Sequence, residues 1–236
     1  MTNRKNRTAL VTGASRGLGR ALAEALAADG WRLIVTARGA AELVSVAETL
    51  GPRTVTIAGD VADSWHREGL VDAAEQAGGL DLLVNNASVL GATPMPRLVD
   101  YPIEALERAL QINTLAPLAL SQELLPGLRA RHGAILNITS DAAVEAYETW
   151  GGYGATKAAL EQLSAVLAVE EPQVAVWWVD PGEMRTEMLR AAMPGEDLSQ
   201  TPPPESVAPA LLRLIDGHLP SGRYRAADLE PAKAPA

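Results

Sequence analysis

The sequence predicts a single α/β domain, in which a doubly wound, mostly parallel, seven-stranded sheet carries helices on both of its faces. Three observations predict this fold class. Short apolar runs alternate with longer amphipathic segments, a glycine-rich turn follows the first apolar run, and a length of 236 residues suits one such domain. The apolar runs are continuous and rich in β-branched residues, which is typical of strands covered on both faces.

The expected elements alternate in chain order. Strands are expected at Thr8–Val11, Arg32–Thr36, Thr54–Ala58, Leu80–Val84, Ala134–Thr139, Val174–Val179 and Arg223–Arg225. Helices are expected at Leu18–Asp29, Ala40–Leu50, Trp65–Ala77, Pro102–Arg131, Tyr153–Glu170 and Glu205–Asp216. Repeated strand–helix alternation implies a parallel sheet with right-handed crossovers. Pro117 lies inside the fourth helical segment, so a kink or break is expected near Ala116.

The chain is expected to form one domain over residues 1–236, because no linker, internal repeat or low-complexity run divides it. Residues 1–7, which include Arg7, are expected to be a solvated basic tail. Residues 187–205 are rich in proline and polar residues and are expected to be an irregular substrate loop, since long loops in compact domains often act as lids. Residues 230–236 are expected to be a disordered tail.

Composition excludes several classes of function. The chain has 20 Lys+Arg against 29 Asp+Glu, a formal charge of −9, so nucleic-acid binding is not expected. The absence of cysteine excludes a thiol nucleophile, and the histidines (His66, His132 and His218) lack metal-binding spacing, so no metal is expected. No apolar run is long enough to cross a membrane, and no secretory signal is visible, so the expected location is the cytoplasm.

A glycine-rich turn leads from the first strand into the first helix. Gly13 permits a tight turn, Gly17 allows the backbone to approach a phosphate, and Gly19 lets the helix pack closely on the sheet. Backbone N–H groups at the start of the helix then face an anion. A plain strand-to-helix turn is the alternative explanation of this motif taken alone.

A possible acid–base pair lies on one helix. Tyr153 and Lys157 are four residues apart, so their side chains share a helix face. A neighbouring ammonium group lowers the pKa of a phenol and makes it a better proton donor and acceptor at neutral pH. Ser140 ends the fifth strand, at the sheet edge where ligands bind. Its hydroxyl could therefore bind a carbonyl oxygen together with Tyr153, although a lone YxxxK pair is common on exposed helices.

These motifs occur in an order that resembles the short-chain dehydrogenase/reductase superfamily, in its classical subfamily, over residues 8–186. The resemblance implies a Rossmann fold and a catalytic tetrad of Asn113, Ser140, Tyr153 and Lys157. In that tetrad Tyr153 exchanges the proton, Ser140 orients the substrate oxygen, and Lys157 lowers the pKa of the tyrosine and bonds the nicotinamide ribose. Asn113 is expected to hold a water of a proton relay.

The resemblance also implies contacts with a dinucleotide. The expected cofactor-binding residues are Gly13, Ser15, Arg16, Gly17, Leu18, Gly19, Arg38, Asp60, Val61, Asn86, Ala87, Tyr153, Lys157, Pro181, Gly182 and Thr186. Asp60 matches a family residue that contacts adenine, and Thr186 matches the threonine of the PGxxxT motif. Ser88 stands where the family's NNAG motif has glycine, which is expected to alter the loop beside the cofactor without abolishing binding.

The expected cofactor is NADP(H) rather than NAD(H). An acidic residue after the second strand would bind a ribose diol and repel a 2′-phosphate, but Ala37 and Arg38 occupy that stretch. Arg16 adds a second guanidinium group in the glycine turn, and two such groups suit a phosphate. Either arginine could instead be a solvated surface charge.

The expected function is an NADP(H)-dependent reductase of a ketone or aldehyde, or the corresponding alcohol dehydrogenase, acting on a largely apolar small molecule. The expected substrate-pocket residues, which could equally be packing or oligomer contacts, are Leu90, Tyr147, Trp150, Met184, Met188 and Leu189. Alternatives are a reductase of a tethered or bulky biosynthetic intermediate, a non-catalytic NADP(H)-binding regulator, and a structural module. The resemblance implies a homodimer or homotetramer that associates through residues 102–131 and 153–170.

Overall fold

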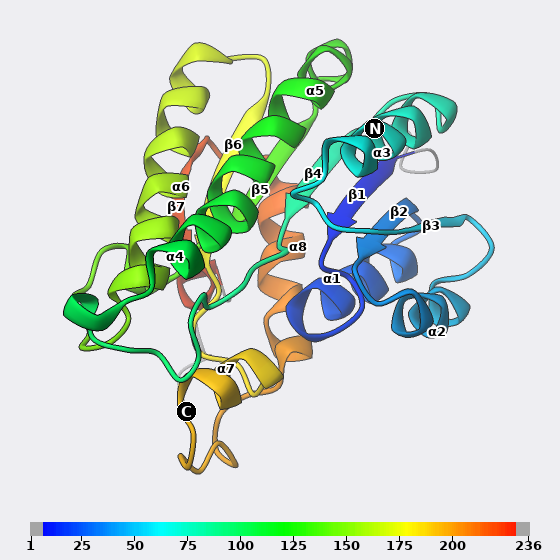
Figure 1. The fold of residues 1–236 in the computed structure, drawn as a ribbon. Helices are drawn as coiled ribbons and strands as arrows, with labels where there is room; N and C mark the ends of the chain where they lie inside the picture. The colour runs from blue at the N-terminus through cyan, green and yellow to red at the C-terminus, as the bar shows by residue number, and fades with distance from the viewer. Residues whose placement is uncertain (1–6, 230–236) are drawn as a thin grey trace, which may run out of the picture.

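The computed structural model describes residues 7–229 and shows one seven-stranded, fully parallel sheet with the order β3-β2-β1-β4-β5-β6-β7 (Figure 1). The strands are β1 Thr8–Thr12, β2 Arg32–Ala37, β3 Thr54–Ala58, β4 Leu82–Asn85, β5 Ala134–Ile138, β6 Ala175–Asp180 and β7 Gly222–Arg225. The predicted doubly wound α/β fold is confirmed. The strand order reverses between β1 and β4, and ligands of open α/β sheets bind at such a point.

Helices cover both faces of the sheet (Figure 1). One face carries α1 Gly17–Ala28, α2 Ala40–Leu50 and α8 Ala208–Gly217. The other carries α3 Ser64–Gln76, α5 Ala116–Arg131 and α6 Gly151–Glu170, with α4 Ile103–Leu110 packed against α6. Successive residues of a strand point to opposite faces, so Leu10 packs with the second group of helices and Val11 with the first.

The long helical segment is interrupted where the sequence predicts a break. A π-helical turn at Gln111–Leu115 separates α4 from α5, and Pro117 occupies the first turn of α5. Proline is tolerated there because the first N–H groups of a helix have no partner within it. The π turn places Asn113 inside the protein, with none of its surface exposed.

The segment 187–205 is not an irregular loop throughout, which corrects the sequence expectation. It begins with the helix α7, Glu187–Ala192, because the Thr186 hydroxyl caps the backbone N–H of Leu189 at 3.2 Å. The expected last helix starts later than Glu205, since α8 begins at Ala208 after a short 3-10 turn.

Arg7 is not a solvated residue of a basic tail, which corrects a second expectation. Its guanidinium group pairs with Asp29 at 2.7 Å and with Asp216 at 2.9 Å, and it lies 4.0 Å from the ring centroid of Trp31. These partners come from distant parts of the chain, which the local sequence does not reveal. Residues 1–6 and the expected disordered tail at 230–236 lie outside the described residues.

A buried polar ladder joins the centre of the sheet to α6. Asn85 donates from its amide to Asn137 Oδ1 at 2.8 Å, and Asn137 donates to Ser164 Oγ at 2.7 Å. All three side chains are buried, so these hydrogen bonds replace bonds to water, although Oδ1 of Asn85 is left without a partner.

Replacing Asn137 with alanine is therefore expected to lower the free energy of unfolding by about 1–3 kcal/mol, since the buried Asn85 amide loses its partner. Urea unfolding monitored by circular dichroism measures the change. Gln122→Ala, at an exposed position of α5, is the control and is expected to change the free energy by less than about 0.5 kcal/mol. Equal effects of the two substitutions would contradict a stabilising role for the ladder.

Candidate active site

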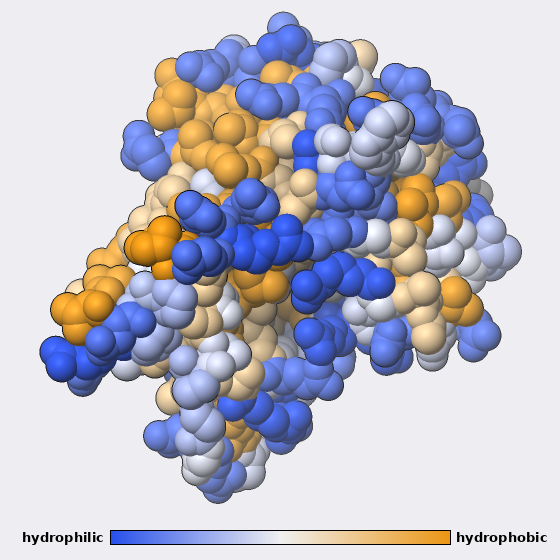
Figure 2. Space-filling view, in the orientation of Figure 1, coloured by the Kyte–Doolittle hydropathy of each residue, from blue (hydrophilic) through white to orange (hydrophobic). Residues whose placement is uncertain are grey.

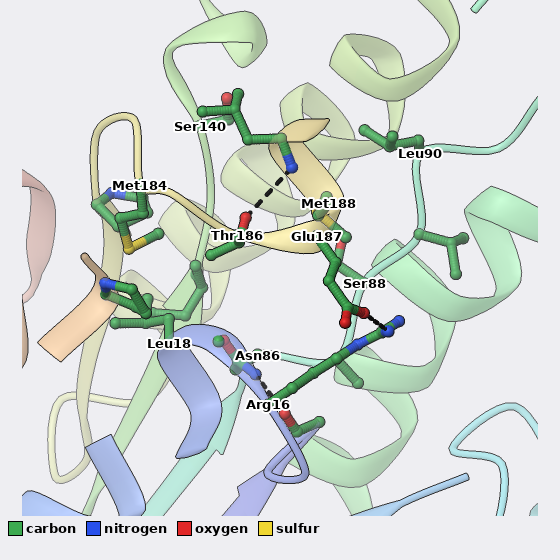
Figure 3. Close-up of a pocket in the computed structure, with 18 of the residues that line it drawn as sticks. Arg16, Leu18, Asn86, Ser88, Leu90, Ser140, Met184, Thr186, Glu187 and Met188 are labelled. Atoms are coloured by element: carbon green, nitrogen blue, oxygen red, sulfur yellow. Dashed lines mark hydrogen bonds and ion pairs between the residues drawn. The ribbon is translucent and has the colours of Figure 1, made fainter. Parts of the chain in front are cut away.

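A cavity of about 1120 Å³ opens at the carboxyl ends of the strands and contains most of the predicted site (Figure 3). It is lined by the predicted cofactor residues Gly13, Ser15, Arg16, Gly17, Leu18, Arg38, Asp60, Val61, Asn86, Ala87, Pro181, Gly182 and Thr186. The same cavity holds Ser140, Tyr153, Lys157, Leu90, Tyr147, Trp150, Met184, Met188 and Leu189. Two predicted residues, Gly19 and Asn113, lie behind its wall, where they shape it without lining it.

The glycine turn is held in place by the loop after β4. Asn86 donates its amide to the carbonyls of Thr12 and Gly13 at 2.8 and 3.2 Å, so this side chain orders the turn. A Cβ on Gly19 would lie 2.4 Å from both Asn86 Nδ2 and Gly13 O, so this position requires glycine. Gly13 and Gly17 have φ values of 66° and 56°, which favour glycine.

The turn fits a dinucleotide phosphate. Gly17 begins α1, and among the described residues no side chain caps its first turn and no acidic residue lies in it. The first N–H groups of a helix are free to bind an anion when nothing caps them. The uncapped N–H groups of α1 thus provide donors for a pyrophosphate. The glycines of the turn carry no side chain and leave space for it on the cavity side.

Two arginines line the cavity near the glycine turn. Arg38 follows β2 directly and is exposed, while the preceding Ala37 is buried. Arg16 reaches across the opening to pair with Glu187 of α7, as the dashed line in Figure 3 shows, and both side chains are more than 60% exposed. Asp60 accepts a hydrogen bond from Ala62 N at 2.9 Å and pairs with Arg108, so its carboxylate is already engaged.

Tyr153 and Lys157 occupy one face of α6, and both are buried. The ammonium nitrogen of Lys157 donates to the carbonyl of Ile138 at 2.8 Å and lies 5.6 Å from the centroid of the Tyr153 ring. Helix α6 thus positions the two side chains side by side against the end of β5, as the four-residue spacing predicts.

The direction of the tyrosine shift differs from the sequence expectation. Burial raises the pKa of Tyr153 to about 12, while hydrogen bonds with Ser88 and Ser140 act to lower it and Asp141 and Asp180 act to raise it. Burial lowers the pKa of Lys157 to about 7. Lys157 is not among the groups that shift the pKa of Tyr153 in this structure, so its expected lowering of that pKa stays a prediction for the site with its cofactor bound.

Ser140 lies at the end of β5 and begins a 3-10 turn. Its hydroxyl donates to Asp141 Oδ1 at 2.9 Å and accepts from Ala142 N at 3.2 Å. Its carbonyl accepts from Arg223 of β7 at 3.3 Å, and Arg223 also pairs with Glu161 at 3.0 Å. No local signal in the sequence identifies Asp141 as the partner of the serine.

Asn113 acts as a buried clamp. Its Oδ1 accepts from Val89 N at 2.9 Å and from Ser88 Oγ at 3.2 Å, and its amide donates to Val89 O at 2.8 Å and to Thr156 Oγ1 at 2.9 Å. Both lone-pair directions and both amide hydrogens are thus engaged. The side chain of Asn113 is therefore fully engaged by the protein, and a relay water at this residue stays a prediction.

The other end of the cavity is mostly apolar. Leu90 and Tyr153 form a cluster with Trp150 and Met188, and the rings of Trp150 and Tyr153 meet edge to face at 5.9 Å. Met184 packs instead against the core beneath α1 and α8. Tyr147 donates its hydroxyl to Asp141 Oδ2 at 3.1 Å, which adds a polar side to this end.

Comparison with known proteins identifies the family. The family model described as "short chain dehydrogenase" matches residues 7–197. The chain belongs to the short-chain dehydrogenase family. It is accordingly an oxidoreductase that acts on CH–OH groups or on the corresponding carbonyls, and the predicted family is confirmed.

Two reductases and one solved structure are among the proteins similar to this chain. L-xylulose reductase of Bos taurus is 38% identical over 195 residues, which cover 79% of this chain and 75% of that protein. D-erythrulose reductase of Gallus gallus is 37% identical over 190 residues, which cover 79% and 74% of the two chains. The structure of a short chain dehydrogenase of Shigella flexneri complexed with NADP has 29% identity and a TM-score of 0.88, covering 95% of this chain and 100% of that one.

Burial of Lys157 predicts a pH-dependent stability. The unfolded chain holds this proton with the ordinary pKa of 10.5 and the folded chain with a pKa of about 7. Between these values the unfolded state binds more protons, so the folded state gains stability as pH rises. Relative to Lys157→Met, the wild-type free energy of unfolding is expected to increase by about 1.4 kcal/mol per pH unit across this window.

Urea unfolding of both proteins without cofactor, at about pH 7 and about pH 9, measures this difference. Groups other than Lys157 titrate in both proteins and cancel in the comparison. A difference that stays constant between the two pH values would show that the lysine keeps its ordinary pKa.

Proposed function

We propose that this short-chain dehydrogenase is an NADP(H)-dependent reductase of a ketone or aldehyde, or the corresponding alcohol dehydrogenase. The observation that carries the proposal is that Ser140, Tyr153 and Lys157 lie in the same cavity as an uncapped, glycine-bounded helix start. A protein that only binds or senses the nucleotide has no use for Ser140 and Tyr153 together at that place.

The roles of the residues follow from their positions. The cofactor, when bound in the cavity, supplies the hydride for the carbonyl carbon. Tyr153 donates its hydroxyl proton to the carbonyl oxygen, and Ser140 turns its own proton from Asp141 toward that oxygen. Lys157 donates to Ile138 O and has further protons for a ribose hydroxyl.

Preference for NADP(H) is supported by the charges near the adenine end. Arg38 and Arg16 both line the cavity, and among the described residues no acidic side chain directly follows β2. A 2′-phosphate would attract both guanidinium groups and would compete with Glu187 for Arg16. The Shigella flexneri structure, a relative complexed with NADP, agrees with this preference.

A largely apolar substrate is supported by Leu90, Trp150 and Met188 around the tyrosine. A small hydroxy ketone is the second candidate, because Asp141 offers a carboxylate beside Ser140 that can accept a substrate hydroxyl. The names of the bovine and chicken relatives, L-xylulose reductase and D-erythrulose reductase, favour this second class. Reduction of a tethered or bulky biosynthetic intermediate stays an alternative.

A homodimer or homotetramer is part of the proposal. Exposed apolar side chains gather on the α4–α6 side of the molecule, where Figure 2 shows orange surface, and include Ile103, Leu115, Val166 and Val169. Such side chains suit contact with a second copy. Among residues 7–229 no helix is both long and apolar enough to span a bilayer, and a cytoplasmic location stays a prediction.

The reductase activity is tested by following NADPH absorbance with an aryl methyl ketone and with L-xylulose. Wild type is expected to oxidise NADPH with at least one of them, and Tyr153→Phe is expected to lower kcat by about 10²–10⁴-fold, since the proton donor is lost. Tyr224→Phe is the control, because Tyr224 does not line the cavity and its hydroxyl donates to Pro220 O. Turnover by Tyr153→Phe at the wild-type rate would refute the mechanism.

Cofactor preference is tested by steady-state kinetics with NADPH and NADH. Arg38→Ala is expected to raise the KM for NADPH by about 10–100-fold, since a charge-assisted hydrogen bond is lost, and to leave the KM for NADH nearly unchanged. Arg32→Ala, whose guanidinium group donates to Ala77 O elsewhere on the surface, is the matched control. A wild type that prefers NADH would contradict the assignment.

A further inference from the structure

Glu161 extends the face of α6 that carries the acid–base pair. It lies four residues after Lys157, and side chains at this spacing share one face of a helix. The ammonium group of Lys157 donates to the carbonyl of Ile138. The carboxylate of Glu161 accepts from the hydroxyl of the next residue, Thr139, at 2.8 Å. This face of α6 thus contacts the last residue of β5 and the residue after it, immediately before Ser140.

Arg223 of the edge strand β7, red in Figure 1, joins the carboxylate of Glu161 to the main chain of Ser140. Its Nε donates to Oε1 and Oε2 of Glu161 at 3.0 and 3.1 Å, and its Nη2 donates to the carbonyl of Ser140 at 3.3 Å. The side chains of Arg223 and Glu161 are only 27% and 12% exposed. Water and salt screen such a partly buried ion pair less than one at the surface, so its attraction is retained in solution.

The ion pair stands behind the wall of the cavity. The cavity is lined by Thr139 and Ser140 but, among the described residues, by neither Glu161 nor Arg223. The pair can therefore affect a substrate only through the chain segment that it holds. The carbonyl of Ser140 also accepts from Ala143 N at 3.2 Å, which closes the turn that follows β5. One restraint thus acts just before Ser140, and a second acts on Ser140 itself.

We propose that Arg223 and Glu161 are positioning residues, which hold the Ser140 hydroxyl where it can bind the substrate oxygen beside Tyr153. The ion pair contacts no reacting atom and gives up no proton. Its hydrogen bonds to Thr139 and to the Ser140 carbonyl fix the point at which the serine leaves β5. A displacement of about 1 Å at a reacting group costs about 100-fold in rate. The inference rests on the proposed reductase function, because it acts through the same serine.

Coupling between Arg223 and Ser140 tests the inference. Arg223→Met is expected to lower kcat/KM for the better of the two carbonyl probes by about 10-fold or more in the wild-type background. In the Ser140→Ala background, measured at higher enzyme concentration, the same change is expected to lower it by less than about 2-fold, since the hydroxyl that the pair positions is absent. Loss of a merely structural ion pair would reduce kcat/KM by the same factor in both backgrounds.

Two further variants separate loss of the donor from general damage to β7. Arg223→Lys keeps a cation that can donate to Glu161 or to the Ser140 carbonyl, and it is expected to recover part of the lost kcat/KM. Arg225→Met removes an exposed arginine of the same strand and is expected to match wild type. The KM for NADPH is expected to stay nearly constant in all three variants of β7, because Arg223 and Arg225 do not line the cavity.

Hydrogen–deuterium exchange gives a readout that needs no turnover. The amide of Ala143 donates to the Ser140 carbonyl, so exchange in the peptide that contains residues 141–144 reports on this turn. Arg223→Met is expected to speed this exchange by about 5-fold or more, since one restraint on the turn is lost, while Arg225→Met leaves it unchanged. Peptides from α2, on the opposite face of the sheet from α6, report global unfolding and are expected to exchange at the wild-type rate.

Equal losses of kcat/KM in the two backgrounds would overturn the inference, as would unchanged exchange at residues 141–144 in Arg223→Met. Failure of the proposed function is distinguishable, since it would show as a wild type that oxidises NADPH with neither carbonyl probe. The exchange of the Ser140 turn would then decide alone whether the ion pair holds the serine.

Discussion

The buried amide of Asn113 is the constraint on which the geometry of the site depends. It sits in the π turn between α4 and α5 and bonds at once to the loop after β4 and to Thr156 of α6. These are the two segments that carry Ser88 and Tyr153. A buried amide that lacks a hydrogen-bond partner costs free energy of folding, so these hydrogen bonds keep the three segments in fixed relative positions. The side chains that these segments carry into the cavity are thereby held in place.

Reactivity at this site is set by dehydration as much as by charge. Tyr153 and Lys157 are both buried. Burial raises the pKa of Tyr153 and lowers the pKa of Lys157, and both shifts favour the neutral form of the side chain. Neighbouring hydroxyls therefore matter more than they would at a hydrated surface, since they are the donors that remain when water is excluded.

The fold could be predicted because buried parallel strands require continuous apolar runs, which the sequence displays in order. The predicted cofactor and catalytic residues gather around one cavity because strand ends meet at one edge of a parallel sheet, although their roles stay predictions. Partners distant in sequence could not be predicted, as with Arg7 and Asp216. The burial that shifts Lys157 likewise depends on packing, whereas α7 had a local signal in the Thr186 cap.

The ion pairs of Arg7 have a consequence for the helices on one face of the sheet. Asp29 ends α1 and Asp216 lies in the last turn of α8, and the negative end of a helix macrodipole repels a carboxylate. Arg7, at the start of the sheet, bonds to both carboxylates and offsets this repulsion. The guanidinium group of Arg7 thus offsets the repulsion at the C-terminal ends of both helices and holds the start of β1 between them.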